Sequence, residues 1–115
     1  MLERGAVPNA QTNDGATPLH YAFRSGRRAV VLQLLLEHGA NSNTRTSDDL
    51  TPLHLASDYG DCRTVHLLLE HGARVGAEDR KGMTPLHLAS KYENRSAANL
   101  LLGNGASVDA EDGKV

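Results

Sequence analysis

The sequence predicts an all-α fold, a solenoid of short helix pairs stacked side by side. Two periodic features predict it. A Thr-Pro-Leu-His block occurs three times, at residues 17–20, 51–54 and 84–87, so its copies begin at nearly equal intervals. A Gly-Ala pair recurs with almost the same spacing, and its copies begin at Gly5, Gly39, Gly72 and Gly105. One short helix pair cannot bury its apolar face alone, so this period predicts units that stack on one another.

Each Thr-Pro-Leu-His block marks the start of a first helix. Threonine is a favoured helix cap, and proline suits the first helical position, where its missing N–H costs no hydrogen bond. We expect helices of about two turns that begin after Thr17, Thr51 and Thr84. The first two of these helices should end near Gly26 and Gly60.

A second helix is predicted before each later Gly-Ala pair, where a Leu-Leu-Leu run places apolar residues at helical spacing. Asp61 and Asn94 occupy equivalent positions in successive units, and either side chain can cap its helix. Arg27 occupies the equivalent position in the first unit and has no acceptor for this role. The glycine of each pair can end the helix in the left-handed conformation without steric cost.

These blocks resemble the ankyrin repeat over essentially the whole chain. The family pattern joins D-x-x-G-x-T-P-L-H-x-A to a later L-L-x-x-G-A, and three in-phase copies stand here. The resemblance implies an ankyrin-repeat solenoid of helix-turn-helix units with β-hairpin-like loops. It divides the chain into a partial unit, three repeats and the start of a further unit: residues 1–13, 14–46, 47–79, 80–112 and 113–115. The partial units suggest a piece of a longer array, with a complete small protein as the alternative.

Several positions depart from the family pattern. Asp49 replaces the glycine of the hairpin, Gly76 replaces the asparagine of the loop, and Glu93 replaces the glycine between the two helices of the third repeat. Ala97 and Ala98 also stand where bulkier apolar residues are usual. We therefore expect the third repeat to be less tightly packed than the others.

The resemblance implies a structural role for the histidine of each block. Its imidazole would bond to the threonine that caps the helix and to the backbone of the adjoining loop. The structural-motif residues are Thr17, His20, Thr51, His54, Thr84 and His87.

No catalytic or metal-binding signature is present in the sequence. His66 and Glu70 are four residues apart and can share a helix face, but the spacing of the zinc-protease motifs is absent. Cys62 stands at a helix start without a catalytic partner signature. We therefore expect no enzyme activity, no catalytic residue, no metal and no cofactor.

Charge and composition limit the class of partner. The chain has 12 Lys and Arg against 14 Asp and Glu, a net charge of -2, which disfavours binding to a phosphate backbone. No apolar run reaches the ~20 residues that span a bilayer, so we expect no membrane insertion. The single cysteine cannot form an internal disulfide, and we expect a reducing compartment, the cytoplasm, with the nucleus as the alternative.

The resemblance further implies that partners dock on the concave surface formed by the loops and the first helices. Tyr59 and Tyr92 occupy equivalent positions on this surface, as do Leu50 and Met83. Tyrosine is enriched at binding hot spots, although both rings could instead lie on neighbouring aliphatic stems. The predicted partner-binding residues are Arg24, Leu50, Asp58, Tyr59, Arg80, Met83, Lys91 and Tyr92.

Charges are expected to alternate along this surface. The first basic group contains Arg24, Arg27 and Arg28, and an acidic group and a second basic group follow it in the next two repeats. Such alternation favours a protein partner with the complementary pattern. We expect a monomer, or part of a longer chain, that works as an adaptor or scaffold segment. The alternative is an architectural spacer in a longer array whose partners bind elsewhere.

Overall fold

The computed structural model describes residues 11–13, 15–24, 27–59 and 61–106, and in this part of the chain every regular element is a helix. The first pair consists of α1 (Pro18–Tyr21), extended by the 3-10 turn η1 (Ala22–Arg24), and α2 (Arg28–Glu37). The second pair is α3 (Pro52–Tyr59) and α4 (Cys62–Glu70), and the third is α5 (Pro85–Lys91) and α6 (Arg95–Gly103). The predicted all-α fold is confirmed.

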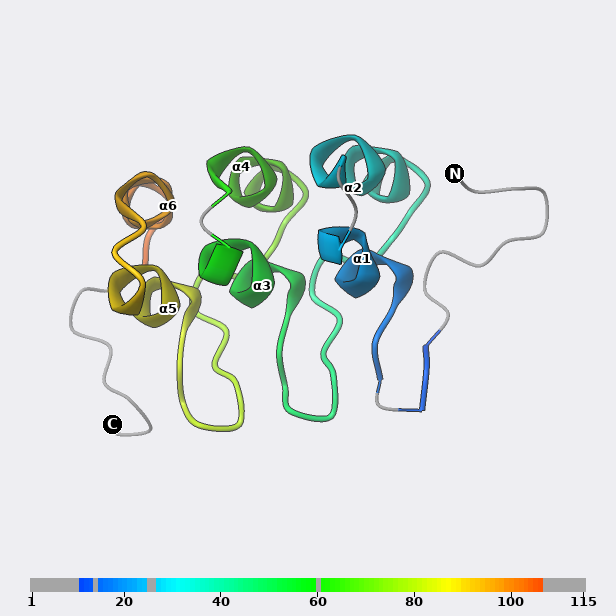
Figure 1. Ribbon diagram of the computed structural model, residues 1–115, viewed down its shortest axis with the longest axis horizontal. Coiled ribbons are helices and arrows are strands. Elements are labelled where there is room, and N and C mark those ends of the chain that lie inside the picture. Colours follow the sequence, from blue (N-terminus) through cyan, green and yellow to red (C-terminus); the bar gives the residue numbers. More distant parts are fainter. Residues whose placement is uncertain (1–10, 14, 25–26, 60, 107–115) are drawn as a thin grey trace.

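The three pairs stand side by side in two layers (Figure 1). Helices α1, α3 and α5 form one layer, and α2, α4 and α6 form the other. The long loops that join one pair to the next all extend to the same side of the stack. Each unit therefore contacts mainly its neighbours, which is the arrangement of a solenoid.

Leucines fill the space between the layers. The middle residue of each Leu-Leu-Leu run is buried, with exposed fractions of 6% at Leu35 and 0% at both Leu68 and Leu101. The leucine of the first two Thr-Pro-Leu-His blocks is also buried, as 0% of Leu19 and 1% of Leu53 is exposed. Burial of one such side chain contributes about 1.5–3 kcal/mol, so the stacking of the pairs supplies most of the stability of these short helices.

Two of the predicted second-helix starts differ in how they are capped. The side chain of Asp61 caps α4 as predicted, because its Oδ1 accepts from the N–H of Arg63 at 3.1 Å and of Thr64 at 3.4 Å. The prediction for Asn94 is wrong: its side chain makes no cap bond to α6. Its Nδ2 instead donates to the carbonyl of Ser57 in the preceding unit, at 2.7 Å.

The helix ends follow the glycine prediction, and two departures from the family pattern keep the glycine conformation. Gly39, Gly72 and Gly105 have φ angles of 91°, 86° and 96°. Asp49 and Glu93 have φ angles of 62° and 58° although they carry side chains. The backbone therefore keeps the left-handed conformation at these two positions, at a steric cost. Gly26 and Gly60, the predicted ends of the first helices, lie outside the described residues.

The loops turn back on themselves without forming strands in the described part of the chain. In the loop before α3, the N–H of Thr46 donates to the carbonyl of Leu50 at 3.0 Å. The N–H of Asp49 donates to the carbonyl of Thr46 at 2.8 Å. The loop before α5 repeats this pattern at the equivalent residues, Asp79 and Met83. These are tight turns of the hairpin-like kind that the resemblance implied.

Candidate partner-binding surface

A histidine in each of the first two units joins the helix layer to the next loop. His54 accepts at Nδ1 from the backbone N–H of Thr51 at 3.1 Å, and its Nε2 lies 2.8 Å from the carbonyl of Met83. Because the amide can only donate and the carbonyl can only accept, the ring must be neutral with its proton on Nε2. His20 has the same two bonds, to Thr17 at 3.0 Å and to the carbonyl of Leu50 at 3.1 Å.

His54 is suited to a structural role rather than to proton transfer. None of its surface is exposed. Burial lowers its pKa below the ordinary value of 6.5, and the hydrogen bond to Met83 and the nearby charge of Asp79 oppose this effect only in part. In the third unit, His87 accepts from the N–H of Thr84 at 3.0 Å and is half-buried.

A pocket of about 180 Å³ opens between the first and second units, on the side of the loops and first helices. Its apolar wall comes from Leu50, Leu55 and two tyrosines, Tyr21 and Tyr59. The loop residue Leu50 is half-buried, and the bond from His20 fixes its carbonyl. The pocket also has polar lining from His20 and Thr46, so apolar and polar groups meet in one concave site, as they do in many binding sites.

Tyr21 is a member of this pocket that the sequence analysis did not single out. It is 44% exposed and lies in α1 at the position equivalent to Leu55 in α3. The sequence signal that could have identified it is a tyrosine at a position where the next unit has leucine.

Tyr59 ends α3 with half of its surface exposed. Its ring lies 6.0 Å from that of Phe23, centroid to centroid, and the guanidinium carbon of Arg28 lies 5.1 Å from its centroid. The exposed face of the ring is therefore held in place by an aromatic contact and a cation contact. At the equivalent position in the next unit, Tyr92 is also 50% exposed, with Nζ of Lys91 at 5.5 Å from its centroid.

The loop tips of the second and third units are tied together by Arg80. Its Nη2 donates to the carbonyl of Ser47 at 2.6 Å, and its Nη1 lies 3.8 Å from Oδ1 of Asp48. An open hollow of about 430 Å³ lies here, lined by Asp48, Leu50, Asp79, Arg80 and Lys81. Opposite charges of neighbouring units therefore pair with each other within the chain.

The remaining predicted partner-binding residues lie on the same units in different environments. Met83 and Asp58 are half-buried, and their carbonyls accept bonds from His54 and Asn94. Arg24 lies in η1, and its side chain is outside the described part. The expected alternation of charge needs a correction, because Arg27 and Arg28 line a separate hollow at the start of α2.

His66, Glu70 and Cys62 were the candidates for metal binding or catalysis. Nε2 of His66 lies 3.3 Å from Oε2 of Glu70, but both side chains are more than half exposed. Among the described residues, no three His, Cys, Asp or Glu side chains come together in a way that could hold a metal. Cys62 is exposed. None of the helices described here has the length and apolarity to cross a membrane.

These features define a class of protein: a helical-repeat solenoid that displays an aromatic pocket and a row of loop tips. A family model described as "Ankyrin repeats (3 copies)" matches residues 1–79 and, again, residues 48–112. The chain belongs to the ankyrin-repeat family, whose members are generally non-enzymatic modules for protein–protein interaction. No curated protein matches the chain at a significant level.

Proposed function

We propose that this chain binds a protein partner on its concave surface, as an adaptor or scaffold segment, and that it works without turnover. The observation that carries the proposal is Tyr59, which is half exposed beside the pocket formed with Tyr21, Leu50 and Leu55. A pocket rimmed by tyrosine is where the binding energy of protein interfaces concentrates.

The fixed geometry of this surface supports the proposal. Phe23 and Arg28 hold the ring of Tyr59, and the bonds from His20 and His54 fix the backbone at Leu50 and Met83. A surface whose side chains and loops are already ordered loses less conformational entropy when a partner binds. Tyr92 extends the same type of exposed ring to the next unit.

The single cysteine supports a reducing compartment for this activity. Cys62 is exposed, and the sequence offers no second cysteine with which to pair. We therefore propose the cytoplasm as its compartment, with the nucleus as the alternative.

The test begins with the wild-type chain as bait. A partner that it retains is purified and titrated by calorimetry against the wild type and the Tyr59→Ala/Tyr92→Ala variant. We expect the double variant to bind at least about 30-fold more weakly, because about 2 kcal/mol or more is lost when hot-spot tyrosines are truncated. Circular dichroism should show unchanged helicity.

Leu102→Ala provides the matched control. Leu102 is also apolar and is 40% exposed, but it lies in α6, in the layer that α6 forms with α2 and α4. Its affinity should equal that of the wild type. Equal affinity of the tyrosine variant would remove this surface from the proposal. Failure of the wild type to bind any partner saturably would favour the architectural spacer instead.

A further inference from the structure

The pocket between the first and second units has the size of one side chain. We call it the tyrosine pocket, after Tyr21 and Tyr59 in its wall. Its volume is about 180 Å³, and protein cavities of about 150 Å³ accept a benzene molecule. Sites for drug-sized ligands start at about 300 Å³. The tyrosine pocket therefore suits a single large side chain of a partner.

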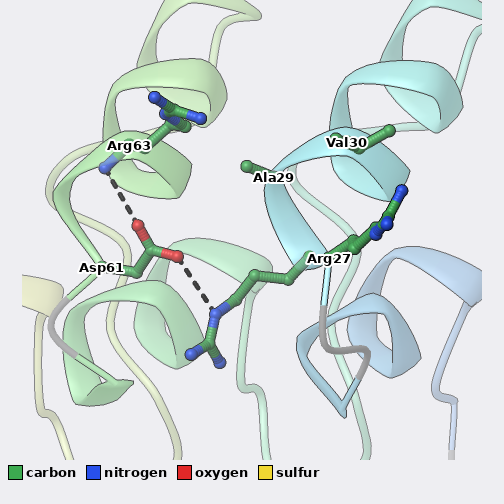
Figure 2. A pocket seen from close by; sticks show the side chains of 6 residues that line it. Arg27, Ala29, Val30, Asp61 and Arg63 are labelled. Atoms are coloured by element: carbon green, nitrogen blue, oxygen red, sulfur yellow. Dashed lines mark hydrogen bonds and ion pairs between the residues drawn. The ribbon is translucent and has the colours of Figure 1, made fainter.

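The tyrosine pocket differs in charge from the other hollows of the stack. Within the described part of the chain, no Asp, Glu, Lys or Arg lines it. In the hollow between the starts of α2 and α4, by contrast, Asp61 pairs with Arg28 at 3.0 Å, and Arg63 lies on the same side as Asp61 (Figure 2). The hollow at the loop tips contains Arg80, and a hollow on the third unit contains Glu93. Because an ionised side chain leaves water at a high cost unless it is paired, the tyrosine pocket disfavours a charged side chain.

The polar groups that line the tyrosine pocket are already bonded within the chain. Nε2 of His20 donates to the carbonyl of Leu50 at 3.1 Å, and its Nδ1 accepts from the N–H of Thr17 at 3.0 Å. Oγ1 of Thr46 accepts from the N–H of Asp48 at 3.3 Å and from that of Leu50 at 3.2 Å. What the pocket offers a partner is therefore chiefly the apolar and aromatic surface of its walls.

Aromatic surface remains exposed at the tyrosine pocket. Tyr59 is 50% exposed although its ring contacts the ring of Phe23 and the guanidinium of Arg28. Tyr21 is 44% exposed. Aromatic rings attract each other beyond the effect of buried area, in tilted or offset arrangements. A phenylalanine side chain in this pocket therefore gains ring contacts that a leucine side chain lacks.

We propose that the tyrosine pocket seats one phenylalanine side chain of the protein partner. This inference rests on the function proposed for the surface and adds the residue by which the partner is recognised. The size of the pocket selects one side chain, the absence of lining charge selects an uncharged one, and the tyrosines select an aromatic one.

The probe is N-acetyl-phenylalanine amide, titrated into the ¹⁵N-labelled chain and compared with the corresponding leucine and glutamate derivatives. We expect saturable shifts of the backbone amides of Tyr21, Leu50 and Leu55, with nuclear Overhauser effects between the probe ring and the methyl groups of the two leucines. The phenylalanine derivative should bind at least about threefold more tightly than the leucine derivative. The glutamate derivative should give no saturable shift.

Tyr59→Leu tests the aromatic wall, because it keeps an apolar side chain and removes the ring. This variant should bind the phenylalanine derivative at least about threefold more weakly than the wild type does. Tyr92→Leu is the matched control, since Tyr92 occupies the equivalent position and is also 50% exposed, but does not line the pocket. Its affinity for the probe should equal that of the wild type. Both variants should fold, because leucine is a good helix former, and Tyr21→Leu replaces Tyr59→Leu if that variant unfolds.

The outcomes separate this inference from the function proposed above. Equal affinity for the three derivatives would overturn the inference, as would equal losses in Tyr59→Leu and Tyr92→Leu. A probe that does not bind, together with a protein partner that still requires Tyr59 and Tyr92, would overturn the inference and leave the proposed function intact. Selective binding of the phenylalanine derivative without any protein partner would support the assignment of the pocket and contradict the proposed function.

Discussion

The two junctions between neighbouring units share one bond and otherwise use different side chains. At the first junction, between residues 14–46 and 47–79, Asn43 and Ser42 reach across to the carbonyls of Gly72 and His71, at 3.0 and 2.9 Å. At the second, between residues 47–79 and 80–112, the equivalent positions hold Gly76 and Val75, which have no polar side chain. The histidine bond to the next loop is present at both junctions.

One pair of equivalent residues makes the contrast clearest. Asp61 accepts from Arg28 of the preceding unit at the first junction, whereas Asn94 donates to the carbonyl of Ser57 at the second. The first contact joins α2 to the start of α4, and the second satisfies a carbonyl near the end of α3. The repeat motif thus sets the stacking, while residues outside the motif decide how each junction is held.

The largest effect is expected from the bond that the junctions share. His54→Ala should lower the free energy of unfolding by about 2–4 kcal/mol, because it leaves the Thr51 amide and the Met83 carbonyl unpaired in a buried site and opens a cavity. Urea denaturation followed by circular dichroism measures it. His20→Ala is the counterpart at the first junction and should cost somewhat less, because 6% of His20 is exposed against 0% of His54. A loss below about 1 kcal/mol for His54→Ala would contradict this ranking.

The asparagines test the difference between the junctions. Asn94→Ala should cost about 1–2 kcal/mol, because its bond to the Ser57 carbonyl is partly buried. Asn43→Ala should cost about 1 kcal/mol or less, since water can replace its exposed bonds to Gly72 and Arg74. Chemical denaturation of both variants under the same conditions measures the two losses. A larger loss of unfolding free energy for Asn43→Ala than for Asn94→Ala would contradict this ranking of the two bonds.

The pH dependence of stability should follow the neutral state of His54. Burial lowers its pKa below 6.5, so the unfolded chain binds more protons than the folded chain once the pH falls below that value. Its contribution to stability is complete above pH 6.5 and is lost on acidification towards the folded-state pKa, with a slope of at most about 1.4 kcal/mol per pH unit. The free energy of unfolding, measured for the wild type and His54→Gln across pH 5–8, should fall more steeply on acidification in the wild type. Parallel profiles would exclude His54 as the source.

A small gain in stability is expected at the two non-glycine residues with left-handed backbone, one in each of the last two units. Glu93→Gly should raise the free energy of unfolding by about 1 kcal/mol, because glycine has no side-chain clash at a φ of 58°. Asp49→Gly should gain less, since aspartate tolerates this conformation better than glutamate. Thermal denaturation of both variants compares them, and a destabilised Glu93→Gly protein would disprove the strain argument.

The sequence predicted what is local and periodic. The threonine cap, the following proline and the Leu-Leu-Leu run specify each helix pair through contacts within a few residues, and the period specifies the stack. The contacts of Asn94 and Arg28 could not be predicted in this way. Their partners, Ser57 and Asp61, are tens of residues away in the sequence, and the capping pattern of Asn94 pointed to its own helix.

The candidate surface was predictable only in outline. Tyr59 and Tyr92 were predicted because they repeat with the period of the units. Tyr21 stands where the next unit has leucine, so it gave no periodic signal. Charge alternation along the sequence also misplaced Arg27 and Arg28, because the pattern does not say on which side of a helix start a residue lies. Their position between two units depends on the stacking itself.

The most direct test is native-state hydrogen exchange, followed by NMR, in the wild type, Asn43→Ala and Asn94→Ala. If the junctions are held by separate side chains, Asn43→Ala should lower the protection of amides in α1 and α2 and leave α5 and α6 unchanged. Asn94→Ala should lower protection in α5 and α6 and leave α1 and α2 unchanged. A uniform loss of protection over all helices in both variants would contradict the account.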